Sequence, residues 1–166
     1  MLKQAFTKGK SSLARGARFA IVASKYNTKF VDGMLRPAKA ALVQAGAAQV
    51  EVVRVPGAFE IPAVAAKLAA ESKRPFSAII CLGVILRGET THAEHIGQAV
   101  SHAFAEIQVA YRVPVIHEVL LLENEEQARV RCLSRTHNRG LEAANTAIDM
   151  AQTMKRIERL AANQTA

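Results

Sequence analysis

Residues 83–96 hold the densest group of side chains in the sequence that could bind an anion and move a proton. A buried strand is expected to lead into this stretch, and a helix is expected to begin near Glu89 or Thr90. The first N–H groups of a helix lack partners within it and attract anions together with the helix dipole. Thr90 and Thr91 add hydroxyl donors, and His92 can carry a proton near neutral pH. The pattern favours a phosphate site beside an acid/base group, although threonine pairs also cap helices for structural reasons alone.

These residues require a scaffold, and the hydrophobic pattern predicts one. Short apolar runs indicate four buried strands, and longer stretches with apolar residues at helical spacing indicate the helices between them. The predicted strands are 18–24, 50–55, 77–82 and 114–122, and the predicted helices are 28–44, 63–72, 90–112, 125–132 and 141–162. Strands that alternate with long helices form a parallel sheet covered on both faces. The sequence therefore predicts an α/β fold with three layers, α/β/α, in which a flavodoxin-like four-stranded parallel sheet has helices on both faces.

Polar residues follow three of the predicted strands. Tyr26 and Asn27 come after the first strand, residues 57–60 after the second, and residues 83–92 after the third. Ligands of such folds bind beyond the carboxyl ends of the strands, so the three loops are expected to converge there. Pro62 suits the first turn of a helix. Glu60 would then lie at the start of that helix, with its carboxylate at the same edge of the sheet.

Length and composition limit the class of protein. The 166 residues suit one domain, half of them are apolar, and only 5% are aromatic. No apolar run approaches the ~18 residues of a membrane span, and no signal-peptide pattern appears, so a cytoplasmic protein without a membrane partner is expected. The formal charge of +8 is concentrated near the amino terminus. We expect a flexible basic arm at 1–16 and a single domain at 17–166, with a transit peptide as the second interpretation of the arm.

Metal and thiol chemistry find little support in the pattern. Cys81 and Cys132 lie far apart without ligand spacing, and we expect two reduced thiols. His92 and His95 could form a metal-binding pair, but no third ligand and no HExxH-type pattern accompanies them. No metal site is therefore predicted.

Ordered blocks of this sequence resemble the 6,7-dimethyl-8-ribityllumazine synthase family. The blocks are Tyr26-Asn27, Pro56-Gly57-Ala58-Phe59-Glu60-Ile61-Pro62, residues 83–92, Gln127-Ala128 with Arg131, and Asn138-Arg139-Gly140-Leu141-Glu142-Ala143-Ala144. One tetrapeptide alone would be a weak signal, whereas the complete set, in order and spacing over about 17–158, is specific.

The resemblance implies an enzyme of riboflavin biosynthesis. Such an enzyme condenses 5-amino-6-ribitylaminouracil with 3,4-dihydroxy-2-butanone 4-phosphate and releases phosphate and two waters, with no metal or organic cofactor. This implied reaction needs an anion site, a proton carrier and a carboxylate for hydroxyl groups, which the residues offer independently.

The resemblance also implies a role for individual residues. His92 matches the catalytic histidine, which would transfer protons during imine formation, phosphate loss and ring closure. Tyr26 matches the aromatic residue that stacks on the pyrimidine, and Arg131 matches the arginine whose planar donor fork binds phosphate. The other matched residues are Ala58, Phe59 and Glu60 for the ribityl chain, the backbone of Val84, Ile85 and Leu86 for the uracil edge, and Glu89 and Thr90 for phosphate. The Glu89 side chain is expected to point away from phosphate or to pair with a cation such as Arg87.

This sequence departs from the family pattern after the fourth strand begins. His117 and Glu118 replace a common Phe-Gly pair, and the resemblance places the first of these residues in the active site of a neighbouring subunit. A histidine can still stack there, and it can also titrate. In the turn at 133–137 the usual glycines and lysine are absent, while Arg135 and Arg139 keep positive charge.

The resemblance implies a homo-oligomer built from pentamers. Some family members assemble twelve pentamers into a 60-subunit shell, and the turn before the last helix influences which form appears. The absence of a length insertion there favours a shell and the loss of glycines opposes it, so both assemblies stay open. The rival functions are an inactive shell or ligand carrier, a flavin carrier, and a nucleic-acid binder that uses the basic arm.

Overall fold

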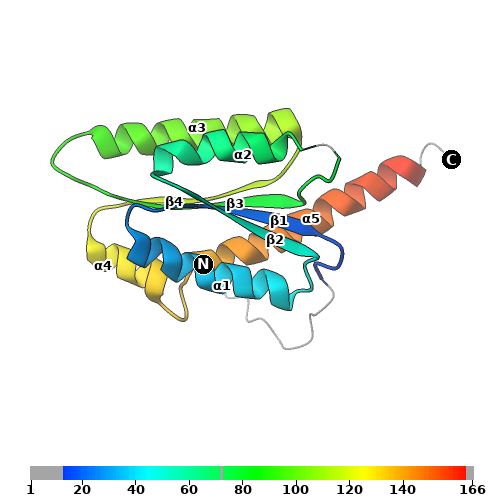
Figure 1. The fold of residues 1–166 in the computed structure, drawn as a ribbon, viewed down its shortest axis with the longest axis horizontal. Helices are drawn as coiled ribbons and strands as arrows, with labels where there is room; N and C mark the ends of the chain where they lie inside the picture. The colour runs from blue at the N-terminus through cyan, green and yellow to red at the C-terminus, as the bar shows by residue number, and fades with distance from the viewer. Residues whose placement is uncertain (1–12, 72, 164–166) are drawn as a thin grey trace.

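The computed structural model describes residues 13–71 and 73–163, and these residues form three layers (Figure 1). The strands are β1 (Arg18–Ser24), β2 (Gln49–Val55), β3 (Ala78–Leu86) and β4 (Val115–Leu122). The α-helices are α1 (Thr28–Gln44), α2 (Ile61–Ala69), α3 (His92–Tyr111), α4 (Glu125–Ala128) and α5 (Arg139–Asn163), and the shorter turns are a 3-10 turn η1 (Ala58–Glu60) and a π-helical turn η2 (Arg129–Leu133).

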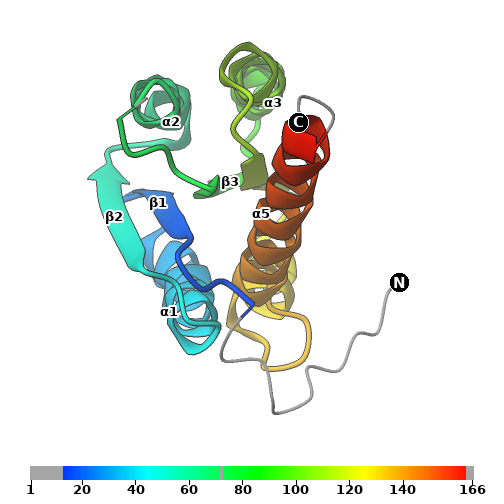
Figure 2. The same cartoon turned by 90° about the vertical axis from the view of Figure 1, so that its right-hand side faces the viewer.

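The sheet is parallel throughout its four strands. Its order is β2-β1-β3-β4, so β1 and β3 are central and β2 and β4 form the edges. Helices α1 and α5 pack on one face, and α2 and α3 cover the other (Figure 2). The predicted three-layer α/β/α fold is confirmed.

The core has two halves, one on each face of the sheet. Side chains of the central strands alternate between them, so Phe19 and Ile21 face α1 and α5 while Ala20 and Val22 face α2 and α3. Helix α1 contributes its buried stripe to the first half and runs unbroken through Pro37. Gly46, with φ of 86°, ends the turn after α1 in a left-handed conformation that glycine adopts without strain.

Two of the element boundaries that differ from the sequence prediction lie within residues 82–92. Strand β3 continues to Leu86, because its pairing with β4 runs on to Leu86 opposite Leu122. Helix α3 begins at His92, so Glu89 and Thr90 lie in the preceding loop. His92 is therefore the first residue of the helix and does not lie one turn inside it.

Close packing joins α5 to α1. A Cβ built on Gly140 would lie 2.0 Å from the Met34 carbonyl oxygen, so only glycine permits this approach. The Asn138 side chain donates to the carbonyl oxygens of Gly33 at 3.0 Å and Cys132 at 2.7 Å, and accepts from the Gly140 N–H at 2.9 Å. These bonds fix the turn that enters α5.

The ends of the described chain differ in their packing. Ala14 is already buried, and its N–H donates to the Ala45 carbonyl at 2.9 Å, whereas the predicted basic arm lies mostly outside the described residues. The far end of α5 projects beyond the sheet (Figure 1), and Ile157 and Leu160 are exposed there. Among the described helices, none combines the length and apolar character needed to span a membrane.

Candidate active site

Hydrogen bonds join the loops at the carboxyl edge of the sheet. The Tyr26 N–H donates to the Pro56 carbonyl at 3.1 Å, which connects the loop after β1 to the loop after β2. The Asn27 side-chain Nδ2 donates to the Val84 carbonyl at 2.8 Å, which connects the loop after β1 to the end of β3. The predicted convergence of the three loops is confirmed.

Asn27 adopts a left-handed backbone conformation at the start of α1, with φ of 54°. Asparagine tolerates this conformation better than most residues. Its side chain makes no hydrogen bond to the first turn of α1, because the amide instead reaches Val84. The sequence alone did not predict this bridge between the loops.

Tyr26 and Glu60 both lie close to Gly57. The Gly57 N–H donates to Glu60 Oε2 at 2.8 Å, and this bond holds the carboxylate against its own loop. A Cβ on Gly57 would lie 3.3 Å from Tyr26 Cδ2, so a side chain there would crowd the ring. The Tyr26 ring is 72% exposed and the neighbouring Phe59 is 60% exposed, whereas Ala58 is buried. Two aromatic surfaces and a fixed carboxylate thus face solvent at this edge.

The last residues of β3 extend past the end of β1. Pairing of the two strands stops at Ala23 opposite Leu82, while β3 continues to Leu86. Strand residues direct their N–H and C=O groups alternately to the two sides, and Val84 directs its carbonyl to the β1 side. Arg87 donates its N–H to Leu122 on β4, so its backbone groups point to the β4 side. Leu86 precedes Arg87 and therefore directs its N–H and C=O groups to the opposite side, where β1 lies. The backbone edge of Leu86 therefore faces the side where β1 has ended.

The loop between β3 and α3 is exposed. Arg87 forms ion pairs with Glu94 at 2.6 Å and Glu123 at 2.9 Å, and these acceptors raise its pKa. The sequence suggested that Arg87 could pair with Glu89, but in the structure Arg87 pairs with Glu94 and Glu123. Glu89, Thr90 and His92 are all exposed. The His92 N–H makes a long contact of 3.4 Å with Thr90 Oγ1.

Arg131 is not brought to His92 within one chain. It lies on η2, which packs against α1 and α5, whereas His92 begins α3 on the opposite face of the sheet (Figure 1). Arg131 itself is exposed. The single chain thus separates two residues to which the resemblance assigns one active site.

His117 on β4 packs against α3 rather than against the loops. Its ring meets Phe104 edge to face with centroids 5.0 Å apart, and its Nε2 lies 2.8 Å from Ser101 Oγ. Because Ser101 donates to the Gly97 carbonyl at 2.7 Å, we infer that Nε2 carries the proton and donates to Ser101. The Val119 N–H donates to Nδ1 at 3.2 Å, which agrees with this tautomer. Loss of water around the ring lowers the pKa of His117.

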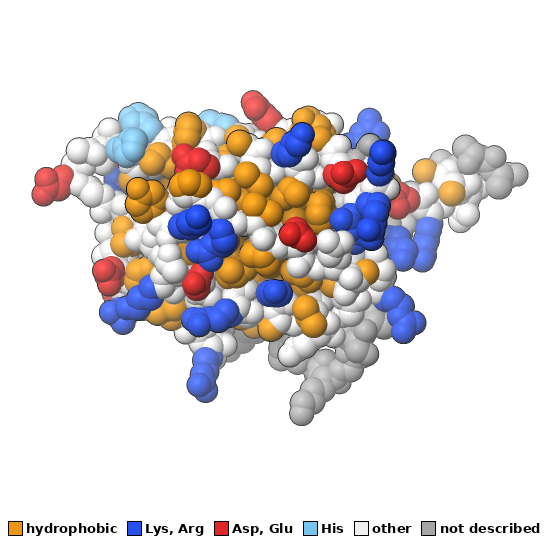
Figure 3. All heavy atoms as spheres, in the orientation of Figure 1, with side chains coloured by type: hydrophobic (Ala, Val, Ile, Leu, Met, Phe, Trp, Pro, Cys, Tyr) orange, Lys and Arg blue, Asp and Glu red, His pale blue; other side chains and the backbone are white. Residues whose placement is uncertain are grey.

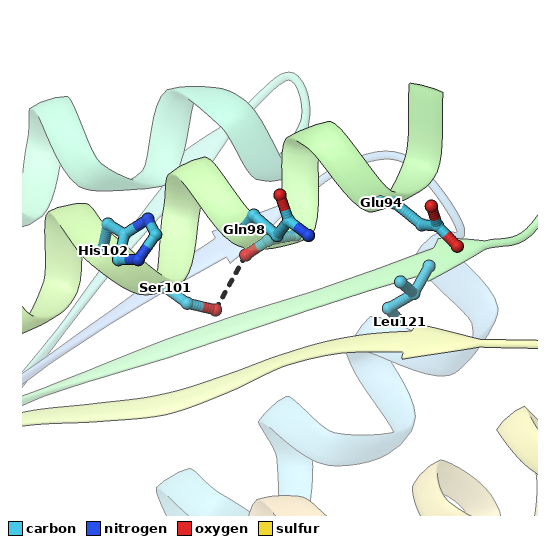
Figure 4. Close-up of a pocket in the computed structure, with 6 residues that line it drawn as sticks. Glu94, Gln98, Ser101, His102 and Leu121 are labelled. Carbon is cyan, nitrogen blue, oxygen red and sulfur yellow. Dashed lines mark hydrogen bonds between the residues drawn. The ribbon is translucent and has the colours of Figure 1, made fainter. Parts of the chain in front are cut away.

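A shallow depression of about 430 Å³ lies between α3 and β4. Figure 4 shows Ser101, Gln98 and Leu121 around it. The residues that line it are Glu94, Gly97, Gln98, Ser101, His102 and Leu121. None of the predicted site residues is among them, so the depression is not the predicted substrate site.

Arg139 is occupied by two carboxylates. Its Nε donates to Glu118 Oε2 at 3.0 Å, and its guanidinium also pairs with Glu142 at 2.5 Å. The sequence led us to expect that Arg139 keeps positive charge in the turn, and the structure pairs that charge with Glu118 and Glu142 of the same chain. Glu118 is only 6% exposed, and burial raises its pKa to about 7 in spite of the arginine.

Cys81 and Cys132 are both buried and unpaired. Burial raises the pKa of both thiols, that of Cys132 to about 11, so neither is an activated nucleophile. Within residues 13–71 and 73–163, no cluster of three or more His, Cys, Asp or Glu side chains could hold a metal ion.

The fold and the loops define an α/β protein of the three-layer parallel class, with its candidate site at the carboxyl edge of the sheet. The chain belongs to the 6,7-dimethyl-8-ribityllumazine synthase family, whose model matches residues 16–155. A 6,7-dimethyl-8-ribityllumazine synthase of Desulfotalea psychrophila is 40% identical over 147 residues, which cover 87% of this chain and 94% of that protein. One of Stenotrophomonas maltophilia is 37% identical over 143 residues, which cover 85% and 91%.

Proposed function

We propose that this chain is a 6,7-dimethyl-8-ribityllumazine synthase, which condenses 5-amino-6-ribitylaminouracil with 3,4-dihydroxy-2-butanone 4-phosphate. The observation that carries the proposal is the junction of three loops by the Tyr26 and Asn27 hydrogen bonds, in a chain of this family. The aromatic ring, the carboxylate and the open backbone edge at this border of the sheet support the proposal.

The uracil substrate fits the border formed by β1 and β3. The exposed Tyr26 ring offers a stacking surface, and the backbone edge of Leu86 offers a donor and an acceptor where β1 no longer pairs. The Asn27 bridge to Val84 keeps these two surfaces at a fixed separation. The Gly57 N–H donates to Glu60 Oε2, so Glu60 Oε1 is the oxygen that accepts hydrogen bonds from the hydroxyl groups of the ribityl chain.

The phosphate substrate fits the loop that leads into α3. The first N–H groups of α3 and the Thr90 hydroxyl are donors for its oxygens, and the helix dipole adds attraction. Arg131 supplies a guanidinium with the fork geometry that suits phosphate. Glu89 contributes its backbone N–H, since its carboxylate would repel the ligand.

His92 moves the protons of the reaction. The amine of the uracil attacks the ketone carbonyl and water departs, which forms an imine. Phosphate then leaves, and closure of the second ring releases the second water. Each step moves a proton to or from nitrogen or oxygen, and an exposed imidazole beside the phosphate loop can exchange it with solvent.

The complete site needs a second copy of the chain. Arg131 and His92 lie on opposite faces of one sheet, so another subunit is the simplest source of the arginine for each histidine. Strand β2 supports assembly, because it is an edge strand whose Val50, Val52 and Val53 stay partly exposed. Hydrophobic side chains gather in the centre of the face that Figure 3 shows. A pentamer, as the family resemblance implies, would cover such surface, and a 60-subunit shell is the larger alternative.

The test is the rate of lumazine formation, followed by absorbance with both substrates. The parent protein should exceed the uncatalysed rate, and His92→Ala should lower turnover by about 10²-fold or more if the imidazole is the proton carrier. His95→Ala is the matched control, because it removes an exposed imidazole from the same helix and should leave turnover near the parent value. A folded parent protein with no rate above background would contradict the proposed function.

A further inference from the structure

Glu118 is a buried carboxylate that the proposed mechanism does not use. It lies in the middle of β4, where His117 is the other polar residue, and points to the face covered by α5. Its residue surface is 6% exposed. Ionised glutamate is rarely buried to this extent without a partner.

Its partner is Arg139, and that arginine is shared. Glu118 Oε2 accepts from Arg139 Nε at 3.0 Å, while the exposed Glu142 takes another edge of the same guanidinium at 2.5 Å. Two carboxylates therefore hold one cation at the start of α5, where the helix dipole disfavours positive charge. These two carboxylates neutralise much of the positive potential that Arg139 would otherwise present to an anionic ligand.

Glu118 also acts on Arg131. The charged groups that reach it are Arg139 and Glu142 from α5 and Arg131 from η2. Burial raises the pKa of Glu118, Arg139 opposes that rise, and Arg131 opposes it less strongly. Burial, and then the charge of Glu118, raise the pKa of the neighbouring Cys132 thiol, which stays neutral. The negative charge of Glu118 must in turn reduce the positive potential around Arg131, because charge interactions are mutual.

Stability does not account for an ionised carboxylate at this position. Burial raises the pKa of Glu118 to about 7, so desolvation outweighs the attraction of both arginines. A neutral glutamine could accept the same hydrogen bond from Arg139 without that cost. The ion pair of Glu118 with Arg139 also lies at the turn that carries Arg131, because Asn138, next to Arg139, donates to the carbonyl of Cys132, next to Arg131, at 2.7 Å.

We propose that Glu118 is a positioning residue whose negative charge weakens phosphate binding, because it offsets the positive charges of Arg139 and Arg131 at the turn that enters α5. This inference rests on the proposed function, in which Arg131 is the phosphate ligand. The consequence for the enzyme is easier release of inorganic phosphate after each turnover. The charge of Glu118 affects only the binding of the phosphate group, so the affinity for the uracil substrate stays unchanged.

The experiment measures binding of inorganic phosphate by titration calorimetry to the parent protein and to Glu118→Gln. At pH 8 the variant should bind phosphate about 5-fold more tightly or better, because a nearby negative charge has been removed. At pH 6 the difference should shrink, because Glu118 of the parent is then protonated as well. The KM for the butanone phosphate should fall in the variant while the KM for the uracil substrate should not change.

Matched variants separate electrostatics from structure. Glu142→Gln removes the exposed carboxylate from the same arginine and should change phosphate binding less, since solvent screens it. The double variant Glu118→Gln with Arg131→Ala should lose the increase in phosphate affinity that Glu118→Gln alone produces. Glu118→Ala serves as a second neutral variant if glutamine disturbs the packing.

Equal phosphate affinity of the folded parent, Glu118→Gln and Glu118→Ala at pH 8 would overturn the inference. The binding measurement needs no turnover, so it is distinct from a failure of the proposed function. That failure would appear as the absence of lumazine formation by the parent protein.

Discussion

His117 shows how one side chain can depart from a family pattern and still suit its surroundings. The ring makes an aromatic contact with Phe104 and a hydrogen bond to Ser101, so a polar side chain is accommodated at the position where the resemblance leads us to expect phenylalanine. Its pKa is lowered because packing against α3 removes water from the ring. The lowered pKa favours the uncharged form of the imidazole.

His117→Phe should become more stable relative to the parent as the pH falls. A histidine whose pKa is lowered in the folded state binds fewer protons there than in the unfolded state, so its contribution to stability is lost in acid. Phenylalanine has no such loss. Thermal unfolding midpoints at pH 8 and pH 5, at one protein concentration, measure the difference, and the same gap between variant and parent at both values would contradict the neutral assignment.

At the scale of elements, Gly140 decides how closely α5 approaches α1. Gly140→Ala should lower the free energy of unfolding by about 1–3 kcal/mol or more, because the new Cβ meets the Met34 backbone, which cannot yield as a side chain can. Gly97→Ala on α3 is the control, since a Cβ there would make ordinary contacts with Leu121 at 3.7 Å. Chemical denaturation of both variants tests this, and equal midpoints would show that α5 shifts without cost.

Hydrophobic pattern predicted the elements because each strand and helix has its own apolar period. The ends of β3 and α3 were harder to predict, since the run that includes Val84 and Leu86 suits either a strand or a loop by sequence alone. Pairing with β4, which lies far along the chain, extends β3 to Leu86. Side-chain bridges such as Asn27 to Val84 and Arg139 to Glu118 also depend on tertiary packing and have no local signal.

Convergence of the candidate site was predictable in part. Parallel topology places the loops that hold Tyr26, Glu60 and His92 at one edge, and this follows from strand order alone. The separation of Arg131 from His92 could not be predicted from the motifs, because a motif does not show on which face of the sheet its residues lie. Packing of η2 against α1 and α5 makes that separation visible.

At the scale of the whole molecule, the account requires residues from two copies of the chain in each active site. Oligomers with closed symmetry supply such pairs at every interface. A chain with a damaged histidine and a chain with a damaged arginine can then complement each other, since some interfaces combine the intact His92 of one chain with the intact Arg131 of the next. The two residues would otherwise stay on opposite sides of one sheet.

The most direct test is the turnover of oligomers assembled together from His92→Ala and Arg131→Ala chains, compared with each variant assembled alone. Random mixing should leave roughly a quarter of the sites with both residues intact, so lumazine formation should rise well above that of either variant. Mass spectrometry of the intact assemblies confirms that the chains have mixed. Mixed assemblies no more active than the separate variants would contradict a shared site and with it the proposed arrangement of His92 and Arg131.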